Sequence, residues 1–233
     1  MFRQLFDTGS STYTYLLACE RTREAVLIDP VLEQCERDVA LMTELGVRPR
    51  WLLDTHVHAD HVTGVTAIKA ACESASAATT AVGLACDAIG YERALSHGDR
   101  LAFGDEHLDV IATPGHTPGS MSFLWRDRLF TGDALLIGGC GRTDFQGGDA
   151  GQLYDAVTRH LFALPGETLV YPGHDYKGRR VSCIAEERDT NARLAGKTRD
   201  EFIALMAALN LPRPKLIDIA VPANKQAGAL MQG

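Results

Sequence analysis

Three of the eight histidines of this chain lie within six positions, together with an aspartate. They are His56, His58 and His61, with Asp60 between the last two, in the segment 51–64. The apolar run before them predicts a buried strand, and the apolar spacing after them predicts a helix. The four side chains therefore occupy a tight connection, where they can face one point. Neutral imidazoles and carboxylates held close together are what a metal site requires, so we predict a metal site rather than a polar loop.

Three further residues that can bind a metal each follow a different predicted strand. They are His116, which lies between two Pro-Gly pairs, then Asp133 and His174. Ligands bind where strand ends face the same way, so we expect these side chains to converge with His56. The combined set could hold one metal with open positions, or two metals bridged by Asp133. Open positions are typical of a catalytic site, and the absence of cysteine from the set argues against a structural zinc site.

Other polar residues have two interpretations each. Arg142, in a glycine-rich loop, is either a solvated charge or a bidentate partner for a substrate carboxylate. Cys140 either packs in the interior or lines the pocket, and packing is favoured because nothing in the sequence indicates a lowered thiol pKa. His160 lies on an apolar helical stripe and is expected to pack, whereas His97 and His107 lie in polar turns and are expected to be solvated.

Length and composition limit the class of protein. A chain of 233 residues with 45% hydrophobic residues predicts one domain over residues 1–233 with a sizeable core. The net charge of −7 argues against nucleic acid and anionic membranes as partners. Six widely spaced cysteines, no signal-peptide-like start and no membrane-length apolar run predict a cytoplasmic protein. The sequence leaves open whether the chain forms a homodimer.

Periodicity predicts an alternation of strands and helices. Strand hairpins are expected at 13–18 with 25–28, at 101–103 with 108–112, and at 121–125 with 129–131. Single strands are expected at 51–53, 79–82 and 168–171, and helices at 32–45, 62–74, 87–95, 153–164 and 182–194. A last helix starts at Thr198, where Thr198-Arg-Asp-Glu201 fits a capping box. Residues 211–214 and the final residues are expected to be irregular, and no helix is predicted after Leu211.

The order of these motifs resembles the metallo-β-lactamase superfamily. Thr55-His-x-His-x-Asp-His61 is followed by Pro-Gly-His116, Gly-Asp133 and Gly-His174, so the resemblance spans most of the chain. It implies an α/β layered fold, an αββα sandwich, with the metal site at one edge. Within the superfamily, the segments 131–146, 172–177 and 215–224 look like those of persulfide dioxygenases.

That resemblance implies a cofactor, a substrate and site residues. One Fe(II) per chain would be bound by His56, His116 and Asp133. Glutathione persulfide would be oxidised by O₂ and water to sulfite and glutathione. The residues that would contact the glutathione moiety are Arg142 and Tyr176. The residues that would orient ligands and water, or form the second metal set of the hydrolase relatives, are His58, Asp60, His61 and His174.

Two other functions remain as alternatives. A glyoxalase II-like thioesterase, a hydroxyacylglutathione hydrolase, would use two zinc ions to make a hydroxide that attacks a thioester. The tail after His174 is short for the helical substrate-binding domain of that family. A metal-binding scaffold without turnover is the third interpretation, and the open metal site argues against it. Iron fits a redox reaction because zinc cannot change its oxidation state.

Overall fold

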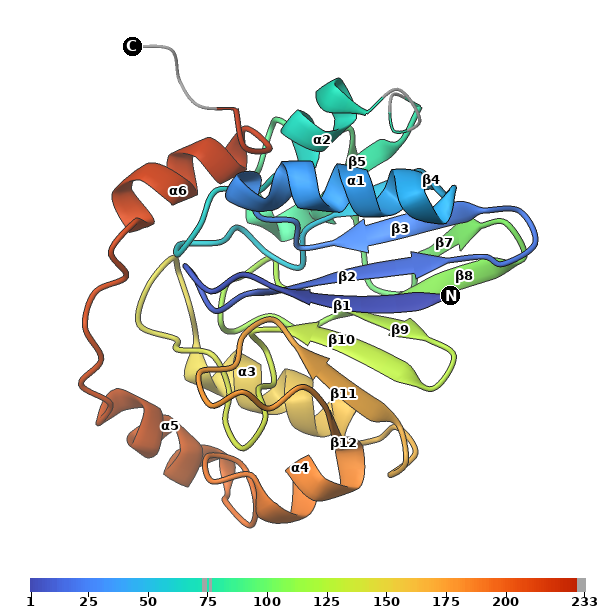
Figure 1. Ribbon diagram of the computed structural model, residues 1–233. Helices are drawn as coiled ribbons and strands as arrows, with labels where there is room; N and C mark the ends of the chain where they lie inside the picture. The colour runs from blue at the N-terminus through green and yellow to red at the C-terminus, as the bar shows by residue number, and fades with distance from the viewer. Residues whose placement is uncertain (73–74, 76, 230–233) are drawn as a thin grey trace.

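Within residues 1–72, 75 and 77–229, which the structure describes, the strands form two six-stranded sheets. The structure is a computed structural model. The sheets pack face to face, and helices cover both outer faces (Figure 1). The predicted αββα sandwich is therefore confirmed. In the same described ranges, no helix is long and apolar enough to cross a membrane.

The first sheet has the order β1-β2-β3-β4-β5-β6. The first three strands are antiparallel, as the predicted hairpin at 13–28 requires, and β3 to β6 run parallel. Strand β1 was not predicted from the sequence. The bounds are Phe2–Phe6, Tyr13–Ala18, Glu24–Ile28, Arg48–Leu53, Thr79–Gly83 and Arg93–Leu95.

The second sheet has the order β12-β11-β10-β9-β8-β7. Only β10 and β11 are parallel, and the other neighbours are antiparallel, so both predicted hairpins of this sheet are confirmed. In chain order from β7, the bounds are Arg100–Phe103, Glu106–Ala112, Met121–Trp125, Arg128–Gly132, Leu169–Pro172 and Ser182–Cys183.

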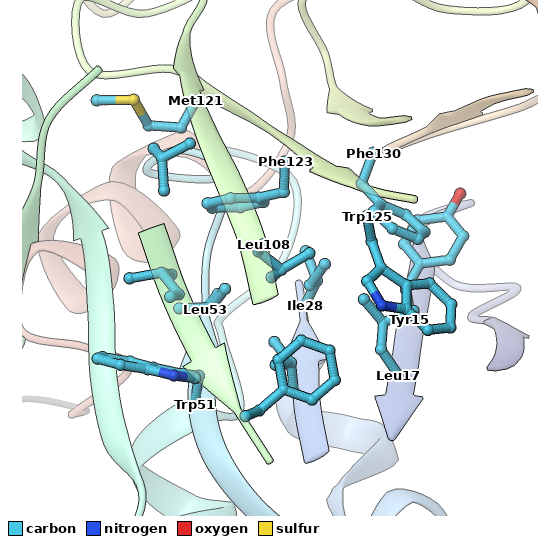
Figure 2. Close-up of a cluster of buried hydrophobic side chains, with 14 of the residues drawn as sticks. Tyr15, Leu17, Ile28, Trp51, Leu53, Leu108, Met121, Phe123, Trp125 and Phe130 are labelled. Atoms are coloured by element: carbon cyan, nitrogen blue, oxygen red, sulfur yellow. The ribbon is translucent and has the colours of Figure 1, made fainter. Parts of the chain in front are cut away.

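Alternating side chains of each strand build two cores. In β2, Tyr15 and Leu17 point into the space between the sheets, whereas Leu16 and Ala18 point to the helices outside. The space between the sheets is filled mainly by aromatic and branched side chains, among them Phe123 of the opposite sheet (Figure 2). Because both faces of β2 are buried, the strand has no polar alternation, and its apolar run was visible in the sequence.

Helices α1 and α2 cover the first sheet, and α3, α4 and α5 cover the second (Figure 1). Helix α3 continues into a π-helical turn at Val157–Leu161, and α5 begins with the predicted capping box. The predicted helix end near Ser74 lies outside the described residues. The bounds of α1 to α5 are Cys35–Leu45, Val65–Ala71, Ala150–Ala156, Ile184–Thr190 and Arg199–Ala207.

Two predictions about the chain between these elements were wrong. The helix predicted at 87–95 does not form, because 93–95 pair as β6 and the N–H groups of Ile89 and Gly90 donate to the carbonyl of Lys225. The tail is irregular only to residue 216, after which α6 runs over Ile217–Lys225. Its Pro222 obscured the helix in the sequence, because proline removes a helical hydrogen bond.

Candidate metal centre

Four predicted site residues follow the C-terminal ends of β4, β8, β10 and β11, as the sequence predicted. They are His56, His116, Asp133 and His174. Backbone hydrogen bonds join the sheets at this edge. Among them, Met121 N–H donates to the carbonyl of Thr55, and Tyr13 N–H donates to that of Gly173, both at 2.8 Å. The strand ends therefore meet between the two sheets.

His56, His116 and Asp133 form one three-residue donor group. One ligand atom from each lies within 4.8 Å of the other two. The two imidazole rings are 4.8 Å apart between centroids and nearly perpendicular, at 84°. His116 Nε2 lies 3.7 Å from Asp133 Oδ2, which is too far for a hydrogen bond but suits two ligands of one ion.

The hydrogen bonds around the two histidines leave both Nε2 atoms free to bind a metal. Thr55 Oγ1 donates its proton to Asp29 Oδ2 at 2.9 Å, so it accepts from His56 Nδ1–H at 2.9 Å. His116 Nδ1–H donates to the carbonyl oxygen of Arg142 at 2.7 Å. Among the described residues, neither Nε2 has a hydrogen-bond partner. Such outer partners fix the tautomer and ring orientation of a metal ligand, so this donor set fits a bound metal.

The electrostatic environment also suits metal binding. Burial, followed by the neighbouring imidazoles of His58 and His116, lowers the pKa of His56 well below its usual value. His56 is therefore neutral, as a ligand must be. Burial alone would raise the pKa of Asp133, but the surrounding imidazoles, His174 first, outweigh burial and hold that pKa well below the usual range. Asp133 is therefore ionised, which is also the ligand form.

His174, Asp60 and His61 form a chain of hydrogen bonds beside this group. His174 Nδ1 lies 2.6 Å from Asp133 Oδ1, and its Nε2 lies 2.9 Å from Asp60 Oδ2. His61 Nδ1 lies 2.9 Å from the same Asp60 oxygen. Because His174 bonds Oδ1 of Asp133, that carboxylate presents Oδ2 towards His116. The buried Nε2 of His61 has no hydrogen-bond partner among the described residues.

His58 is directed away from the donor group by two buried carboxylates. Its Nε2 lies 3.1 Å from Asp29 Oδ1 and 3.8 Å from Asp54 Oδ1. Burial alone would lower the pKa of His58, but these carboxylates, Asp29 first, raise it to about 9. His58 Nδ1 is buried and, within the described ranges, has no partner.

Several positioning residues were not predicted from the sequence. The side chain of Asn224, in α6, donates to the carbonyls of His58 and His61 at 2.9 and 2.8 Å and accepts from Thr63 N–H at 2.9 Å. Asp29, which directly follows β3, accepts hydrogen bonds from Thr55 and thereby fixes His56. Its left-handed φ of 51° is the kind of local signal that a sequence does not reveal.

A cavity of about 590 Å³ opens over the donor group. Its wall combines the loops after the strands with the segment 208–216 that joins α5 to α6, which we call the strap (Figure 1). The residues that line it from these parts include Asp60, His116, Asp133, Cys140, Arg142, Phe145, His174, Tyr176, Arg193, Leu211, Pro212, Pro214 and Lys215.

Arg142 lines this cavity, but its guanidinium is already engaged. It forms a bidentate pair with Asp144 at 2.6 and 2.7 Å and donates to the strap carbonyls of Pro212 and Leu211 at 2.6 and 3.3 Å. These bonds leave one N–H of Nη1 for a substrate. The side chain is 15% exposed, so it is not a solvated charge. A bidentate grip on a substrate carboxylate would require Asp144 to leave.

The remaining predictions have different outcomes. Tyr176 is exposed on the cavity wall, with its ring stacked 6.1 Å from that of His174. Cys140 both packs and lines the cavity, and burial raises its thiol pKa to about 11. The packing predicted for His160 is wrong, because that side chain is exposed, with its ring 5.1 Å from that of His97. The solvation predicted for His97 and His107 is confirmed.

The fold and the convergent histidines and aspartates define a class of protein. The chain belongs to the metallo-beta-lactamase superfamily, whose sequence pattern matches residues 7–174. Metal binding is the common property of such His and Asp sets, and three groups of potential ligands occur among the described residues.

Comparison with individual relatives shows which family within the superfamily the chain belongs to. The chain is 48% identical over 233 residues to persulfide dioxygenase ETHE1, mitochondrial, of Mus musculus, an alignment that covers 98% of this chain and 89% of the mouse protein. The crystal structure of ETHE1 from Myxococcus xanthus superimposes with a TM-score of 0.94 at 56% identity and covers 98% of this chain and all of that one. Within the superfamily the chain therefore belongs to the persulfide dioxygenases. A hydroxyacylglutathione hydrolase of Rhodospirillum rubrum is 41% identical over 174 residues, covering 72% of this chain and 63% of that protein.

Proposed function

We propose that this protein oxidises glutathione persulfide with O₂ and water to sulfite and glutathione. The site would hold one Fe(II), bound by His56, His116 and Asp133. The overall reaction consumes one persulfide, one O₂ and one water and gives one glutathione and one sulfurous acid, so the outer sulfur is oxidised and O₂ is reduced. Relatives named persulfide dioxygenase, aligned over nearly the whole chain, support this activity.

The donor group is the observation that carries the proposal. Two imidazoles with free Nε2 atoms and one carboxylate oxygen face one point beneath the cavity. Two histidines and one carboxylate with open positions are the arrangement used by non-haem Fe(II) oxygenases. When bound there, Fe(II) supplies the redox step that zinc cannot and an open side at which persulfide and O₂ can meet.

The protein's own groups would hold this arrangement in place. Thr55 and the carbonyl of Arg142 fix the two imidazole tautomers, and His174 turns Asp133 so that Oδ2 faces the metal position. Tyr176 offers an aromatic face on the cavity wall, beside which the glutathione moiety would lie. Arg142 would contribute its one remaining N–H to the substrate and would keep the strap over the cavity.

A dinuclear zinc thioesterase is the second candidate function. It is favoured by the unpartnered Nδ1 of His58 and Nε2 of His61, which are buried atoms that a second metal would satisfy. The hydroxyacylglutathione hydrolase relative supports it as well, although the chain covers less than two thirds of that protein. Against it, Asp60 and His174 bond each other, and His58 is paired with Asp29. We therefore favour one metal.

We also infer that the chain works as one domain in a reducing compartment, the cytoplasm. The two sheets share one core, which supports a single domain. The side chains of Cys19, Cys35, Cys86, Cys140 and Cys183 are free thiols, which supports a reducing compartment.

Metal analysis combined with two parallel assays tests the proposal. The protein should contain about one iron per chain when produced with iron, since the donor group holds one ion. It should consume O₂ with glutathione persulfide and release sulfite, and it should leave S-lactoylglutathione intact. Cleavage of S-lactoylglutathione without O₂ uptake would reject the dioxygenase activity in favour of the thioesterase.

A further inference from the structure

The cationic side chains that line the cavity differ in whether a nearby acid neutralises them. They are Arg142, Arg193 and Lys215. Arg142 is paired with Asp144 and is therefore electrically compensated. Arg193 has no acidic partner among the described residues, but its Nη1 donates to the carbonyl of Cys140 at 2.5 Å, which engages part of its guanidinium in the inner wall. Within the described residues, the Lys215 ammonium has neither an acidic nor a hydrogen-bonding partner.

The backbone on both sides of Lys215 is held, although its side chain is free. Before it, the carbonyls of Leu211 and Pro212 accept hydrogen bonds from Arg142. After it, Ile217 is buried and begins α6. The strap thus fixes the base of the lysine at the cavity wall, while the ammonium stays exposed and able to move towards a ligand. A cation that is positioned but not neutralised is suited to recognising an anion.

The two ends of glutathione differ in net charge, and this difference determines which end an unneutralised cation would bind. The γ-glutamyl end has a carboxylate beside an ammonium, so its charges compensate each other. The glycyl end has a carboxylate with no neighbouring positive charge. An unneutralised lysine would therefore favour the glycyl end, as a flexible point charge that does not require bidentate geometry.

We propose that Lys215 binds the glycyl carboxylate of the glutathione persulfide and so contributes to substrate specificity. This inference rests on the proposed function. It places on the strap the carboxylate contact that was one of the two interpretations of Arg142 in the sequence. In this arrangement Arg142 also positions Lys215, because it holds the strap from which Lys215 reaches the cavity.

The test compares two substrates on matched variants. KM is measured for glutathione persulfide and for the persulfide of glutathione monoethyl ester, whose glycyl carboxylate is masked. Lys215→Ala should raise KM for the free acid by about fivefold, which is the upper end for a solvent-exposed ion pair. KM for the ester should change by less than about twofold. Lys215→Glu should raise KM for the free acid further, and Lys215→Arg should restore most of the affinity.

Lys197→Ala is the matched control, because it removes the same charge from a partly exposed position outside the cavity. It should leave both KM values unchanged. The inference is overturned if Lys215→Ala leaves KM for the free acid unchanged, or if it raises KM equally for both substrates. Calorimetric binding of glutathione and of its monoethyl ester repeats the comparison without turnover. Loss of discrimination in Lys215→Ala would then support the inference even if no O₂ were consumed, whereas absent O₂ consumption would reject only the proposed function.

Discussion

His116 Nδ1–H donates a hydrogen bond of 2.7 Å to the backbone carbonyl oxygen of Arg142. Arg142 therefore acts on two parts of the site in different ways. Its main chain orients a metal ligand, and its side chain holds the strap through the carbonyls of Leu211 and Pro212. A substitution of the side chain leaves the carbonyl oxygen in place, so the two roles can be separated by experiment.

Arg142→Ala should weaken substrate binding and leave the iron content unchanged. Losing the charge-assisted bonds that hold the strap and reach the substrate should raise KM by about tenfold. Arg142→Lys should behave like Arg142→Ala, because the three N–H groups of an ammonium cannot replace the four hydrogen bonds of the planar guanidinium. Steady-state kinetics and metal analysis check this. A normal KM would exclude Arg142 from binding, and lost iron would show that the side chain also supports the ligand.

His116→Ala and Asp133→Ala should each lose iron and activity together. Each substitution removes one of three proposed protein ligands, and a two-ligand site does not retain the metal. His160→Ala is the control, because its imidazole is exposed and lies outside the cavity. Iron per chain and O₂ uptake are measured on all three variants. Iron retained by Asp133→Ala, or lost from His160→Ala, would contradict the assigned ligands.

Gly141→Ala should displace two of the proposed metal ligands while all three ligand residues stay the same. A Cβ at this position would lie 2.4 Å from the carbonyl oxygen of Asp133 and 2.8 Å from His116 Nδ1, so both ligands must shift. We expect iron affinity to fall by about tenfold or more, as when a partner of a metal ligand is lost. Gly139→Ala is the matched control in the same loop, because its Cβ would meet only Arg193 Nε, at an ordinary 3.9 Å. Chelator competition on both variants measures the difference, and equal affinities would contradict the prediction.

The proposed metal ligands could be predicted because local patterns reveal them. The strand before His116 alternates buried and partly exposed side chains, and the strand before Asp133 is a buried run. A chemically distinctive residue follows each one. Convergence then follows from the rule that strand ends face the same way in layered folds. The convergence of His56, His116, Asp133 and His174 at one edge of the αββα sandwich could therefore be predicted without knowledge of any tertiary contact.

The supporting residues could not be predicted, because their roles depend on contacts between distant segments. Asn224 fixes the carbonyls of His58 and His61 from α6, a helix that Pro222 concealed. Lys215 lines the cavity only because the strap returns across it. The sequence correctly indicated an irregular segment near residue 211 but contained no signal that this segment covers the site.

Stability of the metal-free protein should fall as pH rises from about 6.5 to 9. His58 has a folded pKa of about 9 and an unfolded value near 6.5, so the folded state binds more protons in this interval. Protonated His58 contributes up to about 3 kcal/mol to the free energy of unfolding. This contribution is complete below pH 6.5 and is lost by pH 9. Burial alone would lower the pKa of His174, but the carboxylates of Asp133 and Asp60 raise it well above its usual value. The stability that protonated His174 contributes is therefore also lost as pH rises.

Urea unfolding at several pH values measures this slope on metal-free protein. His58→Gln should reduce the slope, whereas His107→Gln should leave it unchanged, because His107 is exposed and only weakly paired with Asp109 at 3.7 Å. Equal slopes for wild type and His58→Gln would show that Asp29 does not hold a proton on His58.

Replacing iron with zinc should give a folded protein that consumes no O₂. The donor group would accept zinc, because imidazole and carboxylate are also zinc ligands, but Zn²⁺ has no accessible redox step. Oxidation of the bound iron to Fe(III) should also stop turnover, and a reductant should restore it, since the proposed chemistry starts from Fe(II). The thioesterase interpretation predicts the reverse: two metals, zinc fully competent, and thioester cleavage without O₂. Each metal form is assayed on glutathione persulfide and on S-lactoylglutathione. Two zinc ions per chain with thioester turnover and no O₂ uptake would reject the single iron site.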